Sequence, residues 1–242
     1  MKNIEFEKRN KNKINLMDKD KELKKKTRSW FDHAFKYEYS YHFSWLGRPI
    51  IQFPQDMIAI QELIWKVKPD IIIETGIAHG GSIIFSASIL ELIGKGEVIG
   101  IDVDIRKHNR EEIEKHRMYK RITMIEGSST SQITINKIKK IIGTRKKVMV
   151  FLDSMHTHKH VLEELCNYSK FVKKGSYIIV FDTMVEDMPK NFFDDRPWDV
   201  GNNPKTAVNE FLKSNKRFKV DKQFEKKLLI TSSPNGILKC VK

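Results

Sequence analysis

Acidic and small polar residues follow five short apolar runs, and these residue types could bind a nucleoside and move a proton. Glycines allow tight turns and close approach of the backbone to a ligand. A carboxylate at a strand end can accept hydrogen bonds from ribose hydroxyls. The five groups are Glu74-Thr75-Gly76, Asp102, Glu126-Gly127-Ser128-Ser129, Asp153-Ser154-Met155-His156 and Asp182-Thr183.

Apolar runs and helical spacings alternate from residue 55 onward, which predicts an α/β fold with a doubly wound, mostly parallel sheet and antiparallel C-terminal strands. The carboxyl ends of parallel strands share one edge, so the five groups should converge there. The predicted strands are 71–75, 97–102, 122–126, 148–153 and 177–182, with closing strands at 218–220, 228–232 and 237–241. Residues 233–236 are the predicted hairpin turn between the last two strands.

The turn after the first predicted strand, residues 74–82, is rich in glycine. N–H groups that open the following helix would offer donors to a ligand. The turn has neither the G-x-G-x-x-G spacing of nicotinamide enzymes nor the lysine of a phosphate-binding loop, which disfavours a dehydrogenase.

The first 54 residues differ in composition from the rest. Residues 1–28 contain eleven basic and five acidic residues and predict a basic flexible arm. Residues 29–54 are rich in aromatic side chains and predict an extension that either packs on the core or covers a ligand as a lid. Residues 55–242 then form the α/β domain.

The whole chain has 242 residues and a net charge of +14, which raises the question of a nucleic-acid partner. Beyond the arm both signs are mixed, so we interpret the lysine excess as solvated surface and disfavour nucleic acid. Two cysteines exclude a disulfide scaffold, and we expect Cys166 in the core. No leader or membrane span is predicted, so we expect a cytoplasmic protein.

The strand-end groups resemble those of class I S-adenosylmethionine (SAM)-dependent methyltransferases. Over roughly residues 37–241 further motifs resemble the cephalosporin hydroxylase/rhamnosyl O-methyltransferase family. These motifs are Trp45-Leu46-Gly47-Arg48-Pro49, the turn 74–82, Asp153-Ser154-Met155-His156-Thr157-His158, Pro197-Trp198 and residues 201–208. The resemblance implies a Rossmann-like fold, a homo-oligomer, and methyl transfer to a hydroxyl of a sugar, glycolipid or related cell-surface glycan precursor.

The resemblance also implies which residues bind SAM. They are Glu74, Thr75, Gly76, Ala78, His79, Gly80, Gly81, Ser82, Asp102, Gly127, Ser128, Ser129 and Asp153.

The family pattern places Mg²⁺ between a carboxylate after the fourth strand and an acidic pair after the fifth. Asp153 and Asp182 match two of these metal ligands, whereas Phe181 stands where the third acid is expected. A phenyl ring cannot ligate Mg²⁺, which leaves metal dependence open. Glu186 and Asp187 either replace the missing ligand or belong to a solvated loop.

His156 is the candidate catalytic base, because a histidine side chain ordinarily titrates near neutral pH. Asp153 is the second candidate catalytic residue. The alternative is a structural hydrogen bond at a helix start. A zinc site with His158 and His160 is disfavoured, because the three histidines would point in different directions. In the loop that follows, Trp198 could stack on a sugar ring and Arg196 could hold an anionic acceptor.

Two other functions stay open. The Phe181 substitution suits a non-catalytic module that binds SAM or a glycan, and the basic arm suits an RNA methyltransferase. A glycolipid acceptor would bring the protein to the inner face of a membrane.

Overall fold

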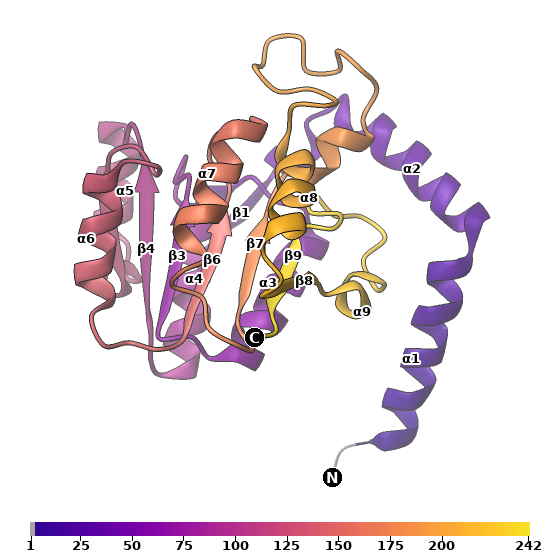
Figure 1. The fold of residues 1–242 in the computed structure, drawn as a ribbon, viewed down its shortest axis with the longest axis horizontal. Helices are drawn as coiled ribbons and strands as arrows, with labels where there is room; N and C mark the ends of the chain where they lie inside the picture. The colour runs from indigo at the N-terminus through magenta and orange to yellow at the C-terminus, as the bar shows by residue number, and fades with distance from the viewer. Residues whose placement is uncertain (1–2) are drawn as a thin grey trace.

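The computed structural model describes residues 3–242 and contains a seven-stranded sheet with helices on both faces (Figure 1). The strand order is β5-β4-β3-β6-β7-β9-β8. The five strands from β3 to β7 run parallel, and β9 runs antiparallel to both of its neighbours, which confirms the predicted doubly wound sheet. The strands are β3 (Ile71–Thr75), β4 (Glu97–Asp102), β5 (Ile122–Glu126), β6 (Val148–Leu152), β7 (Tyr177–Val180), β8 (Phe218–Val220) and β9 (Ile237–Cys240).

The sheet has a hydrophobic core on each of its two faces, where it packs against helices, because successive strand residues point to opposite faces. Ile72 packs with α3, α4 and α5, whereas Ile71 and Ile73 pack with α6, α7 and α8. The helices are α3 (Pro54–Val67), α4 (Gly81–Ile93), α5 (Lys107–Lys115), α6 (Gln132–Ile142), α7 (His158–Tyr168) and α8 (Pro204–Ser214). Shorter helices are η2 (Tyr119–Arg121), η3 (Thr183–Asp187) and α9 (Lys222–Glu225).

The strand order reverses between β3 and β6, so these adjacent strands lead to opposite halves of the sheet. Thr75 pairs with Leu152 at the last register position, and the Asp153 N–H donates to the Thr75 carbonyl at 3.0 Å. A Cβ on Gly76 would lie 2.0 Å from the carbonyl oxygen of Asp153, and the φ of Gly76 is +90°. Glycine is therefore required where the two strand ends meet, which is where doubly wound sheets bind ligands.

The N-terminal segment forms two helices, α1 (Ile4–Lys19) and α2 (Lys21–Phe35), so the predicted arm boundary at residue 28 falls inside a helix. Helix α1 projects from the body and has no buried residue (Figure 1). Helix α2 buries Phe31 against Phe53, Met184 and Met188. Residues 1–2 of the predicted arm lie outside the described residues.

The aromatic extension continues into η1 (Tyr39–Tyr41) and a small hairpin of β1 (Phe43–Trp45) and β2 (Arg48–Ile50). Both turn residues, Leu46 and Gly47, have positive φ angles, as tight two-residue hairpin turns require. No helix within residues 3–242 combines the length and apolar character needed to cross a bilayer.

Two local predictions are wrong. Residues 228–232 do not form a strand, because β9 already pairs on both edges and the Ser232 N–H donates to the buried Asp56 carboxylate at 2.7 Å. The turn 233–236 is consequently not a hairpin turn between strands. Cys166, which we expected in the core, is exposed on α7.

Candidate active site

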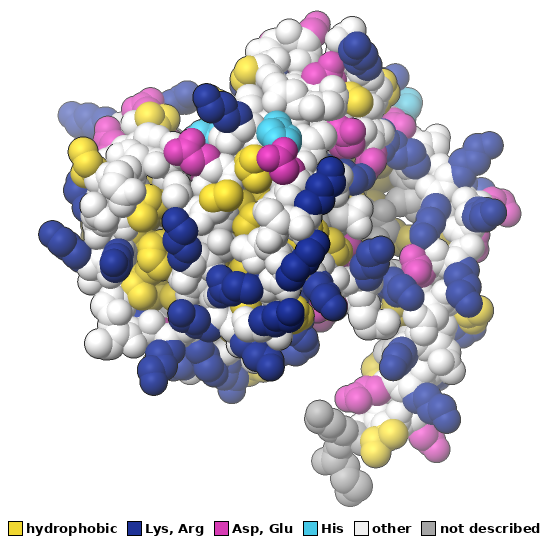
Figure 2. Space-filling model, viewed as in Figure 1, with side chains coloured by type: hydrophobic (Ala, Val, Ile, Leu, Met, Phe, Trp, Pro, Cys, Tyr) yellow, Lys and Arg dark blue, Asp and Glu magenta, His cyan; other side chains and the backbone are white. Residues whose placement is uncertain are grey.

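A cavity of about 550 Å³ opens over the carboxyl ends of β3, β6 and β7. Three groups of residues make up most of its lining, which also includes Met184, Val185 and Ser232. The strand ends contribute Gly76, Ile77, Ala78, His79, Gly81, Ser82, Asp153, Ser154, His156 and Asp182; the N-terminal extension contributes Phe35, Glu38, Ser40, Tyr41 and Pro49 to Phe53; and the loop before α8 contributes Phe192, Phe193, Asp195, Arg196 and Trp198. Figure 2 shows acidic and histidine side chains gathered at the upper edge of the body, with Lys and Arg more abundant below.

Asp153, His156 and Asp182 meet at this cavity. Each offers one ligand atom, and the three atoms lie within 4.8 Å of one another. His156 Nε2 is 3.2 Å from Asp182 Oδ2, and Gln52 Nε2 donates to Asp153 Oδ2 at 3.1 Å. We call these three residues the Asp–His–Asp cluster.

The Asp–His–Asp cluster is suited to hold positive charge. Burial raises the pKa of the Asp153 carboxyl well above its usual range, and the nearby carboxylates of Asp182, Glu74 and Glu164 raise it further. Two carboxylates and an imidazole are a plausible ligand set for a divalent cation, whose charge would offset this repulsion. The residues present therefore fit a metal ion, although the imidazole is unusual for Mg²⁺.

The position of the expected third acid is filled by the buried ring of Phe181, which packs edge-on against Phe151. The two nearby loop acids are engaged elsewhere. Glu186 accepts from Gly201 N at 2.8 Å, and Asp187 forms an ion pair with Lys205 at 2.6 Å. Neither acid replaces the missing ligand in this arrangement.

Trp198 packs against the imidazole ring of His156. The two rings meet edge to face at 4.8 Å, and the Arg196 guanidinium lies over the Trp198 ring at 5.7 Å. Arg196 also pairs with Asp195 at 3.4 Å. Trp198 thus contacts the candidate base. Its stacking on a sugar ring stays a prediction.

Asp102 ties the glycine-rich turn to β4. Its Oδ2 accepts from Ile77 N at 2.8 Å and from Ala78 N at 3.3 Å. Arg48 also fixes this turn, because its guanidinium donates to the His79 carbonyl at 3.0 and 2.8 Å. A ribose bound at Asp102 would share the carboxylate with the turn.

Sequence reasoning missed two residues that support the turn. Besides His79, Arg48 bonds to Asn109 Oδ1, and Asn109 Nδ2 donates to the Ala78 carbonyl. Arg48 stands in a motif that we noted, but an asparagine within a charged helix carries no signal of this contact.

The predicted cofactor residues fall into three places. Gly76, Ala78, His79, Gly81, Ser82 and Asp153 line the cavity. Four residues lie outside its lining: Asp102 at the end of β4, and Gly80, Gly127 and Ser128 in the neighbouring turns. Glu74, Thr75 and Ser129 are buried beneath these turns.

Glu74 is buried in the protein interior. It accepts a hydrogen bond from Ser82 Oγ, while its Oε2 has no partner. The orphan Oε1 of Gln52 belongs to the same small internal cavity of about 10 Å³, which has room for roughly one water molecule. Burial raises the pKa of Glu74 to about 7, so its ionisation disfavours the folded state.

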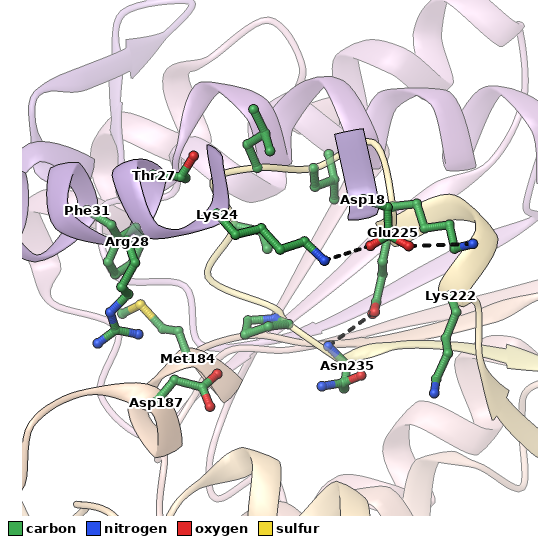
Figure 3. Close-up of a pocket in the computed structure, with 15 residues that line it drawn as sticks. Asp18, Lys24, Thr27, Arg28, Phe31, Met184, Asp187, Lys222, Glu225 and Asn235 are labelled. Carbon is green, nitrogen blue, oxygen red and sulfur yellow. Dashed lines mark hydrogen bonds and ion pairs between the residues drawn. The ribbon is translucent and has the colours of Figure 1, made fainter. Parts of the chain in front are cut away.

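A second cavity of about 430 Å³ lies between α2 and residues 222–235 (Figure 3). Lys24 and Lys226 both pair with Asp18 beside it, and Glu225 accepts from Asn235 N at 3.3 Å. Met184 lines both cavities. Because no strand-end acid or histidine lines the second cavity, we assign the chemistry to the first cavity.

Comparison with known proteins identifies the family. The sequence model described as rhamnosyl O-methyltransferase/CmcI matches residues 37–241. The chain belongs to this family. The match includes the entire sheet and the cavity's strand ends, and excludes α1 and α2.

Relatives of the family include two mycobacterial proteins. The rhamnosyl O-methyltransferase of Mycobacterium tuberculosis (strain H37Rv) is 28% identical over 191 residues, which cover 76% of this chain and 72% of that protein. The enzyme of the same name from Mycobacterium leprae (strain TN) is 26% identical over 148 residues, or 60% of this chain and 62% of that protein. The chain thus spans less than two thirds of the M. leprae protein.

Solved structures confirm the fold. A CmcI structure without ligand superposes with a TM-score of 0.58 at 17% identity, covering 84% of this chain and 77% of that one. A CmcI structure with Mg and SAM has a TM-score of 0.56 at 17% identity, covering 84% and 78%. The predicted Rossmann-like class I methyltransferase fold is therefore correct.

We expect Glu74→Gln to stabilise the protein more at pH 8 than at pH 5. The folded state raises the pKa of Glu74 from 4.5 to about 7, so the carboxyl ionises first in the unfolded chain. Wild-type stability then falls as the pH rises from about 4.5 to 7, and the glutamine variant avoids this loss, by about 1–3 kcal/mol.

Urea denaturation of both proteins at the two pH values measures the difference. Glu163→Gln, at an exposed position on α7, is the control. A stability difference for Glu74→Gln that does not change with pH would contradict the assignment.

Proposed function

We propose that this protein is a SAM-dependent O-methyltransferase that acts on a hydroxyl of a sugar, glycolipid or related cell-surface glycan precursor. The observation that carries the proposal is the Asp–His–Asp cluster, which shares one cavity with the glycine-rich turn at the point where strand order reverses. The names of the mycobacterial relatives support a sugar as acceptor.

The reaction needs position and a proton acceptor. The sulfonium–methyl bond breaks as the acceptor oxygen forms its bond to the same carbon, and the hydroxyl proton must leave. Holding the two reactants in line can supply much of the rate enhancement. The turn 76–82 would hold the methionine part of SAM, and Asp102 would hold the ribose.

His156 is the proposed general base. Asp182 fixes its ring at one nitrogen and Trp198 fixes the ring's orientation, so the imidazole is held at the cavity wall. A histidine oriented by a carboxylate is a common arrangement for proton abstraction.

The cluster would also hold a divalent cation, through Asp153 and Asp182 with His156 as a further ligand. A bound cation would lower the pKa of an acceptor hydroxyl. His156 cannot ligate a cation and accept a proton through the same nitrogen. The role as base is tested by substitution of His156, and the role of the cation is tested by its removal with EDTA.

The acceptor would enter beneath the N-terminal extension. Phe35 meets Phe192 and Phe193 edge to face beside the cavity, which gives its mouth an apolar wall suited to sugar C–H groups. Tyr41 is half exposed, and its partial burial, followed by the charge of Asp182, raises the pKa of its phenol. The phenol therefore stays protonated and can donate a hydrogen bond to an acceptor.

Assembly and location stay predictions. Exposed Ile4, Phe6 and Leu16 on the projecting α1 support contacts between copies, as in the expected homo-oligomer. We also propose that the enzyme works in the cytoplasm, and at the inner membrane face if its acceptor is a glycolipid.

We expect the purified protein to form S-adenosylhomocysteine (SAH) from SAM with an acceptor from a panel of nucleotide sugars and glycolipids. His156→Ala should lower kcat about 10²- to 10⁴-fold, the usual contribution of a general base. The SAH affinity should stay within about twofold of wild type, because the proposed role of the imidazole is to accept the proton of the acceptor hydroxyl and not to bind the nucleoside.

Mass spectrometry of the methylated product and calorimetry with SAH measure both quantities. His108→Ala, on the exposed face of α5, is the matched control. Full turnover by His156→Ala would remove this residue from the mechanism.

We expect Mg²⁺ or another divalent cation to raise the melting temperature of the protein, and EDTA to lower its turnover at least about tenfold. Asp182→Asn should raise the cation concentration needed for half-maximal stabilisation, also about tenfold, because it removes one charged ligand. Asp187→Asn is the control, since Asp187 pairs with Lys205. Turnover that persists in EDTA would show that the cluster works without a metal.

A further inference from the structure

A partly buried hydrogen-bonded cluster joins the turn after β5 to the loop after β6. Ser129 Oγ lies 3.0 Å from His160 Nε2, and Ser154 Oγ lies 3.2 Å from the same nitrogen. The Ser154 hydroxyl donates to Glu164 Oε1 at 2.8 Å, and the Tyr168 hydroxyl donates to the Ser129 carbonyl at 2.7 Å. We call Ser129, His160 and Glu164, with Ser154, the serine–histidine–glutamate cluster.

The carboxyl group of Glu164 contacts this cluster through Oε1, while its Oε2 has no hydrogen-bond partner. Glu164 is 0% exposed, and its Oε1 lies 3.4 Å from His160 Nε2. A buried carboxylate is costly unless it is hydrogen-bonded and paired. The hydrogen bond to Glu164 raises the pKa of His160, against the opposing effect of burial, so the charged imidazole is favoured.

The sheet itself does not fix these two turns against each other. In the sheet, β4 and β3 separate β5 from β6, so no backbone ladder links the ends of β5 and β6. His160 reaches both turns from the first part of α7. Ser154 follows Asp153 of the Asp–His–Asp cluster and lines the active-site cavity. Ser129 is the last residue of a turn that we expect to face the nucleoside.

Ser129 is itself engaged by other groups of the protein. Its side chain is buried, its Oγ is held by His160, and its carbonyl is held by Tyr168. Its effect on a cofactor must therefore pass through the placement of Gly127 and Ser128, which precede it in the turn.

We propose that the serine–histidine–glutamate cluster fixes the turn 127–129 against α7 and thereby sets the affinity for the nucleoside part of SAM. His160 and Glu164 are positioning residues in this account. The inference rests on the proposed function, because it assigns the geometry of the same cofactor site.

His158 provides an internal comparison. It lies two residues earlier on the same helix, but its ring faces α8, where Nδ1 is 2.8 Å from Thr206 Oγ1 and Nε2 is 3.1 Å from Glu210. Removing His158 disturbs helix packing without touching either turn. An effect specific to His160 would therefore not be a general effect of loosening α7.

The test is calorimetry of the full chain with SAH, together with steady-state kinetics. We expect Ser129→Ala and His160→Ala each to raise the Kd for SAH about three- to tenfold, a range typical of one lost hydrogen bond. The kcat at saturating SAM should stay within about twofold, because the Asp–His–Asp cluster is intact. The double variant should bind SAH about as weakly as His160→Ala alone, because the Ser129–His160 contact is already absent from that single variant.

His158→Ala is the control and should bind SAH as wild type does. Ser129→Ala is the mildest change and keeps the test valid if His160→Ala folds poorly, which thermal melting would show. Wild-type SAH affinity in Ser129→Ala, or equal weakening by His158→Ala, would overturn this inference alone. Failure of the unchanged protein to bind SAH would overturn the proposed function, and this inference with it.

Discussion

The close approach of two strand ends is the constraint on which the site depends. The Asp153 N–H bonds to the Thr75 carbonyl, and Gly76 leaves no room for a side chain against the Asp153 backbone. This contact brings the glycine-rich turn and the Asp–His–Asp cluster to the lining of one cavity. A reaction that joins a cofactor methyl to an acceptor oxygen needs that arrangement, because both reactants must lie in line within a few ångströms.

Charge is distributed so that a basic protein carries an acidic site. The chain has a net charge of +14, yet burial and the nearby carboxylates of Asp182, Glu74 and Glu164 together raise the pKa of Asp153. Such a cavity favours positive charge, whether a divalent cation or the sulfonium of SAM. The cost is seen in Glu74, which is buried with one oxygen unpaired. The ionised Glu74 carboxyl thus lowers the stability of the fold, while the same group of acids makes the cavity favourable to a cation.

The sequence predicted the parallel sheet well, because long apolar runs such as residues 71–73 and 148–152 leave few alternatives to a buried strand. It also predicted that Asp153, His156 and Asp182 would come together, since strand ends share an edge. It mispredicted residues 228–232, because an apolar stretch does not reveal that β9 has no free edge or that Asp56 binds Ser232. Long-range side-chain contacts were equally hidden: Arg48 reaches His79, and His160 reaches Ser129 across 31 residues.

The measurement that tests this account most directly is calorimetric titration of the full chain and of Asp102→Ala with SAH. The account predicts saturable binding by the unchanged protein. It also predicts binding at least about tenfold weaker for the variant, which loses charge-assisted hydrogen bonds to the ribose and the anchor of the glycine-rich turn. Equal affinity in the two proteins, or no binding by either, would contradict it.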